Sequence, residues 1–157
     1  MPLQPNGLGP GEEPYTPVLT ASTTNPSLGT GGSAVGGWQR VTGSLIWWWA
    51  VITFGTSPDP GEGYYQVSVP QDPVREPGRV VGDGTILDVS NTLELRPVVA
   101  GCAADLAVAF GGAPSRPFLF DTSDPGGLMS ALVSHEAPFT WAAGDTINVS
   151  GTYQMLG

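Results

Sequence analysis

Hydrophobic and polar positions alternate in short runs along most of the chain, and stretches rich in Gly, Pro, Ser and Thr separate these runs. Alternation with a period of two is typical of β-strands, and interruptions of this composition are typical of turns. The clearest case is a predicted hairpin in which 34–41 pairs with 44–54 around a Thr42-Gly43 turn. The pattern predicts an all-β chain of about eight to ten short strands.

The other predicted strands are shorter. They are 15–21, 64–70, 79–82, 85–89, 92–99, 104–110, 118–120 and the two limbs of a final hairpin over 138–153 that turns at Gly144-Asp145. Pro17 in the first of them indicates a sheet edge or a strand start. The segment 128–135 fits a strand or a short helix, and no repeat of fixed period points to a solenoid or a propeller.

At this length one domain is expected. We predict an antiparallel β-sandwich of jelly-roll type over residues 15–157, preceded by an extended Pro/Gly-rich arm over 1–14. The arm is a candidate attachment element, and its candidate contact residues are Pro2, Leu3, Pro5, Leu8 and Pro10.

The strand 45–54 is apolar on both faces. Side chains alternate across a strand, so Trp47, Trp49 and Val51 share one face, while Trp48, Ile52 and Phe54 share the other. A strand of a solitary antiparallel sandwich usually exposes one face to water. Three exposed tryptophans would forgo on the order of 10 kcal/mol of burial, so we expect both faces to be covered.

Three kinds of cover are compatible with this strand. The same chain can fold over it, through residues 1–14 or a long loop. Another copy of the protein can pack on it in a symmetric oligomer. A ligand such as a sugar ring can stack on exposed indoles. The six apolar residues of the strand are therefore candidates for the core and for a subunit interface.

Composition narrows the class of protein. Gly and Pro are abundant, at 23 and 16 residues, but only 12% of residues are charged and 40% are hydrophobic, which favours a folded chain over a disordered one. The net charge is −9, and no lysine is present to help form a cationic patch, so nucleic acid and anionic membranes are not expected partners. With no signal-peptide pattern and no long apolar run, we expect a soluble product.

The sequence offers little catalytic chemistry. His135 is the single histidine and Cys102 the single cysteine, which is too few for a zinc site or an intrachain disulfide. The cluster Asp121-Thr122-Ser123-Asp124 contains oxygen ligands suited to calcium, but it precedes Pro-Gly and reads better as a turn. No nucleophile elbow or phosphate loop is present. We therefore predict a non-enzymatic protein with no cofactor and no metal.

Segments at both ends of the chain resemble a β-rich surface module of virion proteins from bacteriophages that infect actinobacteria. The matching segments, in order, are Tyr15–Ala21, Asn25–Gly29, Gly37–Val41, Thr53–Gly55, Ser68–Pro70, Pro138–Asp145 and Gly151–Tyr153. Residues 71–137 carry no such resemblance. Each matching segment is short, so the resemblance to this module depends on the order and spacing of all the segments together.

This resemblance implies a non-enzymatic, trimeric component on the outer surface of a capsid or tail. Such modules occur in minor tail proteins and tail fibres. Because the module here makes up nearly the whole chain behind a short arm, a capsid decoration (cementing) role is also expected. The partners would then be two further copies and the major capsid or tail proteins, with loops such as 55–63 facing outward. The alternative is a carbohydrate-binding module that adsorbs to host cell-surface glycan through a tryptophan platform.

Overall fold

A computed structural model describes residues 11–73, 79–89, 94–102, 117–122 and 132–155. Within these ranges the chain is all-β and contains no helix, as the alternating pattern predicts. No helix long and apolar enough to cross a membrane occurs in these ranges.

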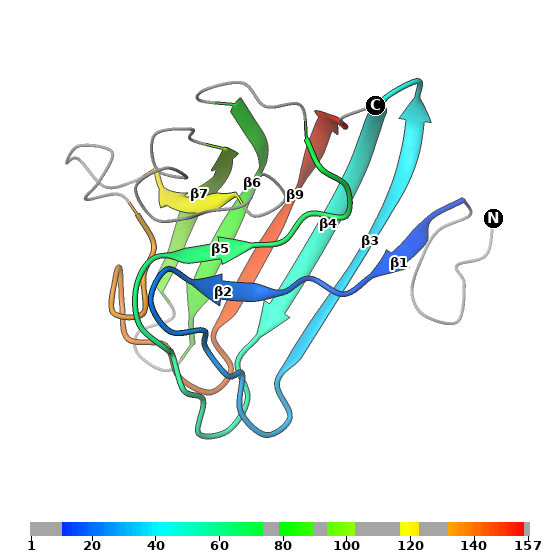
Figure 1. Ribbon diagram of the computed structural model, residues 1–157. Helices are drawn as coiled ribbons and strands as arrows, with labels where there is room; N and C mark the ends of the chain where they lie inside the picture. Colours follow the sequence, from blue (N-terminus) through cyan, green and yellow to red (C-terminus); the bar gives the residue numbers. More distant parts are fainter. Residues whose placement is uncertain (1–10, 74–78, 90–93, 103–116, 123–131, 156–157) are drawn as a thin grey trace.

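Nine antiparallel strands form one sheet in the order β1-β3-β4-β9-β6-β7-β8-β5-β2. Their bounds are β1 Glu13–Tyr15, β2 Leu19–Ala21, β3 Ser33–Thr42, β4 Leu45–Thr53, β5 Tyr65–Val67, β6 Arg79–Asp88, β7 Glu94–Cys102, β8 Phe118–Asp121 and β9 Thr146–Gln154. The sheet curls, so that β2 and β5 run in front of β4 and β9 (Figure 1).

The first two strands lie at opposite edges of this sheet, although only three residues separate them. The single strand predicted over 15–21 is therefore wrong: residues 16–18 form a link between two edge strands, and Pro17 lies in that link. Ser68 holds the link: its Oγ accepts a hydrogen bond from the Val18 N–H (2.8 Å), and its own N–H donates to the Val18 carbonyl (3.0 Å). The Tyr15 hydroxyl donates to the Ser68 carbonyl (3.3 Å). The link therefore connects the two edges across the open side of the curl.

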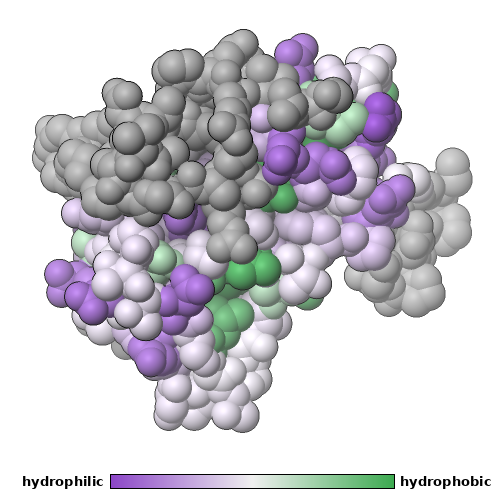
Figure 2. Space-filling model, in the orientation of Figure 1, coloured by the Kyte–Doolittle hydropathy of each residue, from purple (hydrophilic) through white to green (hydrophobic). Residues whose placement is uncertain are grey.

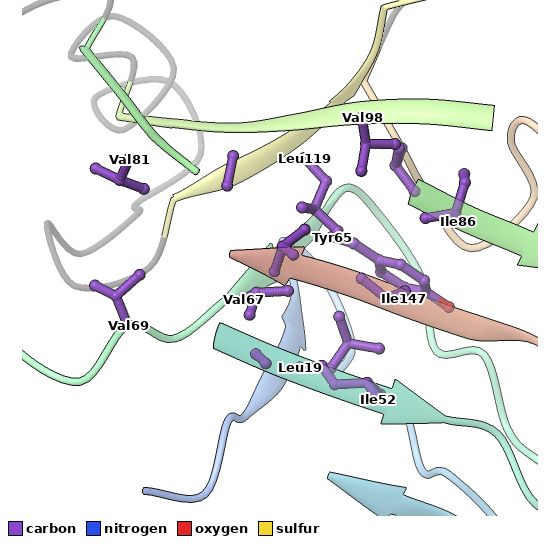
Figure 3. Close-up of a cluster of buried hydrophobic side chains, with 14 of the residues drawn as sticks. Leu19, Ile52, Tyr65, Val67, Val69, Val81, Ile86, Val98, Leu119 and Ile147 are labelled. Atoms are coloured by element: carbon purple, nitrogen blue, oxygen red, sulfur yellow. The ribbon is translucent and has the colours of Figure 1, made fainter. Parts of the chain in front are cut away.

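The hydrophobic core fills the inside of the curl (Figure 3). The inner face of β4, which includes Ile46, Trp48 and Ile52, is fully buried. Leu19 of β2 and Val67 of β5 belong to the same core cluster, as does Ile147 of β9 in the figure. The chain itself thus covers one complete face of β4.

A β-bulge lies where β6 meets β7, with a register shift between Val80 and Gly82. The Trp48 indole N–H donates to the carbonyl of Val81 at this bulge (2.8 Å). Two strands were predicted over this region, 79–82 and 85–89, but they form the single strand β6. The two glycines near its middle weaken the alternating pattern without ending the strand.

Several other predictions can be compared with the observed elements. The hairpin of 34–41 and 44–54 is confirmed as β3 and β4, and the run 118–120 as β8. The predicted strand over 138–143 is wrong, because Asp145 and Ser134 accept hydrogen bonds from Ala142 N–H and the Trp141 indole and hold this segment outside the sheet. The run 104–110 lies outside the described residues. The jelly-roll sandwich of two separate sheets stays a prediction.

β1 begins at Glu13, so the last two residues assigned to the arm are part of the sheet. At the end of the molecule opposite the β3–β4 turn, the loop 22–32 and the loop 55–63 lie side by side (Figure 1). Backbone hydrogen bonds join them at Thr24 with Glu62, Ser27 with Asp59 and Thr30 with Thr56. Figure 2 shows the side of the molecule that carries β2 and β5, where described hydrophobic surface is limited to small areas.

Candidate functional site

The six candidate residues of the tryptophan strand divide between the two faces of the sheet. Trp48, Ile52 and Phe54 are buried in the core. Trp47 and Trp49 lie on the outer face and are partly buried in the single chain. Val51 has the same intermediate exposure. The core therefore accounts for one face of β4, and the other face defines a candidate site for assembly or binding.

We call this site the outer face. Directly paired residues on neighbouring antiparallel strands project from the same side of a sheet, so the register fixes its membership. It consists of Ser33, Val35, Gly37 and Gln39 of β3; Leu45, Trp47, Trp49, Val51 and Thr53 of β4; Thr146, Asn148, Ser150, Thr152 and Gln154 of β9; Val80, Asp83, Thr85 and Leu87 of β6; and Leu95, Pro97, Val99 and Gly101 of β7.

Asp83 is the only charged residue among these, although the chain contains 14 acidic and 5 basic residues. Charged residues are depleted at the centres of protein interfaces, whereas aromatic residues are enriched there. Half of the large hydrophobic side chains that are well exposed among the described residues also lie on this face: Val35 at 51%, Val80 at 52% and Leu95 at 61%. The composition of the outer face therefore resembles that of a protein–protein interface.

The apolar residues of the outer face form two groups. The tryptophan wing consists of Val35 on β3 and Leu45, Trp47, Trp49 and Val51 on β4. The leucine wing consists of Val80 and Leu87 on β6 and Leu95 on β7, and next to it Val99 of β7 packs against the buried cluster of Phe118, Phe120 and Leu132.

Between the wings runs β9, whose outward side chains form the polar row of Thr146, Asn148, Ser150, Thr152 and Gln154. Four of the five positions of this row lie next to an apolar residue of β4, and Thr146 lies next to Thr53. The row offers hydroxyl and amide groups for hydrogen bonds and carries no charge.

The Trp49 indole reaches across β3. Its Nε1–H donates to a carboxylate oxygen of Glu12 (3.4 Å), and Glu12 directly precedes β1, which lies on the far side of β3 from β4. Gly37, opposite Trp49 in the register, has no side chain to obstruct the ring. A cavity of about 320 Å³ lies beside this indole and is lined by Pro14, Tyr15, Thr16, Ala34, Val35, Gly36 and Trp49. Part of the ring is thus covered by the chain itself, which is one of the three covers considered for this strand.

The buried carboxylate of Asp145 has a structural role. Its two oxygens accept hydrogen bonds from the N–H groups of Val89 (2.9 Å) and Ala142 (2.7 Å), and its backbone carbonyl accepts one from Phe54 (2.9 Å). The residue is fully buried. These contacts join the start of β9 to the end of β6 and to the chain after β4.

His135 also joins loops. Its Nδ1 accepts a hydrogen bond from the Gly63 N–H (3.0 Å), and its own N–H donates to the Gly63 carbonyl (3.1 Å). The Glu136 carboxylate lies 3.9 Å from His135 Nε2. Because Nδ1 already accepts a hydrogen bond from the backbone, the side chain of His135 connects its own loop to the loop that ends at Gly63.

The hydroxyls of Tyr15 and Tyr65 donate hydrogen bonds to backbone carbonyls. Burial is the main cause that raises the pKa of Tyr15, and the neighbouring Tyr153 contributes to the same shift. Burial likewise raises the pKa of Tyr65, with a second contribution from the Asp59 carboxylate. Tyr65 donates to the carbonyl of Pro60 (2.7 Å). Both phenols are thereby held in the protonated form.

The candidate calcium cluster is only partly described. Asp121 is buried and accepts a hydrogen bond from the guanidinium of Arg96 (3.0 Å), while residues 123 and 124 lie outside the described ranges. In the described part of the chain no group of three or more His, Cys, Asp or Glu residues is placed to hold a metal ion. The candidate arm residues Pro2, Leu3, Pro5, Leu8 and Pro10 also lie outside the described residues.

Sequence reasoning missed the leucine wing. The run that contains Leu87 and the run that contains Leu95 were recognised as strands, and their outward positions alternate with buried ones. The sequence did not show that these strands lie on the same sheet face as β4. In space β9 lies between β4 and β6, but in the chain it follows both of them.

No protein-family model, no curated protein and no solved structure matches this chain.

Proposed function

We propose that this protein is a non-enzymatic structural component of a bacteriophage virion, on the outer surface of the capsid or tail. It is a homotrimer of jelly-roll-like subunits that acts as a decoration (cementing) protein or as a minor tail protein. Its partners are other copies of itself and the major capsid or tail proteins, to which the N-terminal arm attaches.

One observation supports this proposal most strongly, namely the nearly uncharged outer face with its partly exposed indoles. A chain of net charge −9 exposes a broad five-stranded surface on which Asp83 alone is charged. Partly exposed aromatic residues on a face with so few charged residues favour a contact with another protein surface over exposure to water. Self-association is the simplest way to cover such a face, since each copy brings the same surface.

The site residues favour a structural role over an enzymatic one. Asp145, His135 and the hydroxyls of Tyr15 and Tyr65 each make hydrogen bonds with the backbone. A catalytic centre requires titratable groups that converge on a common space where a substrate fits. In the described ranges the side chains of Asp145, His135, Tyr15 and Tyr65 instead hold loops and strand ends in place through hydrogen bonds to the backbone.

The proposal is tested in two steps. Sedimentation velocity of the purified chain should give a single species of three subunits, and a monodisperse monomer would contradict the assembly. Immunogold labelling of intact particles of a phage that encodes the chain should then decorate the capsid or the tail. Labelling of infected-cell debris without labelling of particles would contradict the virion role.

A carbohydrate-binding role is the second candidate, and the polar row is the observation that favours it. Trp47 and Trp49 project from alternate positions of one strand, and Thr152 and Ser150 lie directly beside them. Indoles flanked by hydroxyl and amide groups suit a sugar, which presents an apolar ring face and a polar rim. Cell-wall glycan from the host should then shift tryptophan fluorescence of a monomeric protein.

A further inference from the structure

The two apolar wings of the outer face differ in shape. The tryptophan wing carries the wide indoles of Trp47 and Trp49, whereas the leucine wing carries the smaller side chains of Val80, Leu87 and Leu95. We propose that the tryptophan wing of one copy packs against the leucine wing of the next copy. This inference rests on the proposed self-assembly and adds which surfaces meet.

The charge distribution identifies a second copy as the occupant. Because each copy carries a net charge of −9, contact between most surfaces of two copies is repulsive. The wings reduce this cost, since the register places Asp83 as the one charged residue of the outer face, and only the Glu12 carboxylate, bonded to the Trp49 indole, reaches the face from β1's side. A partner of opposite charge would gain little from binding here, because the carboxylates that the described residues place beside the wings are those of Asp83 and of Glu12, which accepts a hydrogen bond from the Trp49 indole.

The area of the face is on the scale of a contact with another protein. Five strands spaced by about 4.8 Å, each about nine residues long, cover about 700 Å². A standard protein interface buries about 800 Å² on each partner, so the face supplies about the area of one such interface, divided between two neighbours. A short glycan would leave much of this surface uncovered, including Leu95, which is 61% exposed on the wing far from the indoles.

The order of the strands explains how such contacts close. The wings lie on opposite sides of β9, so a copy that uses both wings has two different neighbours. Contacts between unlike surfaces generate a ring when the rotation closes, and three copies give a trimer. The polar row of β9 then faces the axis. There Asn148, Ser150 and Thr152 form hydrogen bonds with water or with the same residues of the neighbouring copies. Asp83, paired with Ser150 in the register, also stays hydrated there.

The test places one charge on each wing. Val35→Asp modifies the tryptophan wing and Leu95→Asp the leucine wing, at side chains that are 51% and 61% exposed, so neither change disturbs the core. Val18→Asp is the matched control, because Val18 is 44% exposed on the link between β1 and β2, away from the outer face. Far-UV circular dichroism and thermal unfolding verify that all three variants fold.

Each wing variant should sediment as a monomer, with self-association weakened about 100-fold or more, because an unpaired carboxylate would be buried in the contact. The Val18→Asp control should remain a trimer. Mixing the two wing variants should give a 1:1 heterodimer, since the intact tryptophan wing of one meets the intact leucine wing of the other.

The remaining outcomes overturn the inference in distinguishable ways. If either wing variant alone forms a dimer, like wings pair with each other and the assignment is wrong. If the wild-type chain is a trimer and both variants stay trimers, the copies meet elsewhere, and the proposed assembly stands without these wings. If the wild-type chain is a monomer whose fluorescence responds to host cell-wall glycan, the proposed assembly fails as well.

Discussion

Asp145 shows how a single carboxylate organises this molecule. Its side chain accepts hydrogen bonds from two backbone N–H groups that come from different parts of the chain, Val89 after β6 and Ala142 before β9. Hydrogen bonds to a buried charged acceptor are among the stronger ones in proteins, and leaving their donors unpaired is costly. The residue therefore fixes the end of the sheet where β9 starts.

Replacement of this carboxylate should destabilise the protein. Asp145→Ala leaves the N–H groups of Val89 and Ala142 without an acceptor, and we expect a loss of about 2–4 kcal/mol in the free energy of unfolding. Urea denaturation followed by fluorescence measures it. The matched control is Asp59→Ala, because the Asp59 carboxylate accepts from the Gly61 N–H at an exposed turn (3.0 Å). A loss at Asp59 as large as at Asp145 would refute the role of burial.

The two buried phenols predict alkaline instability. Burial raises the pKa of Tyr15 and Tyr65 above the ordinary value of 10.0, so the folded state holds these protons more tightly than the unfolded state. Their contribution is fully present below pH 10 and is lost as the pH rises further, by about 1.36 kcal/mol per pH unit for each group. Unfolding free energies of Tyr15→Phe and Tyr65→Phe should fall less steeply above pH 10 than that of the wild-type chain. Equal slopes would contradict this assignment.

At the scale of elements, the contact between β6 and β9 depends on close backbone approach. A Cβ atom added to Gly84 would collide with the carbonyl oxygen and carbonyl carbon of Asn148 on the neighbouring strand. The register pairs Gly84 with Val149 on the inner face, where the core leaves no space for the strands to separate. Glycine at this position is thus required by packing between strands.

Gly84→Ala should therefore weaken the middle of the sheet. We expect a loss of about 1–3 kcal/mol, typical of overpacking, measured by thermal unfolding. The neighbouring change Thr85→Ala, on the outer face, is the control and should cost less than about 1 kcal/mol. If both substitutions had the same effect, strand propensity rather than close approach would explain the result.

How far the sequence predicts these elements depends on the kind of signal. The hairpin of β3 and β4 was predictable because a long alternating run meets a short turn. The inner and outer sets of β4 followed from the period of two alone. The pairing of β4 with β9 was not predictable, because nothing local in 45–53 specifies a partner about a hundred residues away. The segment 138–143 misled the reading because its aromatic residues enter the core without joining the sheet.

The candidate site was predicted in part for the same reason. Trp47, Trp49 and Val51 were identified as a surface in need of cover from their alternation. The leucine wing, the polar row and the contact of Trp49 with Glu12 depend on the order of strands in space. Such relations are set by long-range pairing, which a single sequence does not display.

At the scale of the whole molecule, the net charge of each copy opposes self-association. The dependence of the association constant on salt concentration should show this effect. Each copy carries −9, so three copies brought together repel one another, while the outer face itself contributes almost no charge. Added salt screens the repulsion and strengthens apolar contacts. The apparent association constant from sedimentation equilibrium should rise between about 0.05 and 0.5 M sodium chloride. A fall over this range would indicate that ion pairs hold the copies together.

Tryptophan fluorescence gives an independent view of the same assembly. Trp48 and Trp141 are buried within one chain, whereas Trp47 and Trp49 are partly exposed. Acrylamide should quench the Leu95→Asp monomer more strongly than the wild-type assembly, because packing against a neighbour protects the outer indoles. Equal quenching in both would show that the indoles are not covered by another copy.

The position of β9 also governs when the chain is able to fold. It lies between β4 and β6 in the sheet, yet it is the last of the nine strands to leave the ribosome. Until it emerges, β4 and β6 each keep an unpaired edge, and the apolar inner residues of both strands lack their neighbour. Such edges bind other nascent chains readily, and pairings this distant in sequence form slowly. Completion of the sheet therefore waits for β9, and the synthesis of β9 acts as the trigger for productive folding.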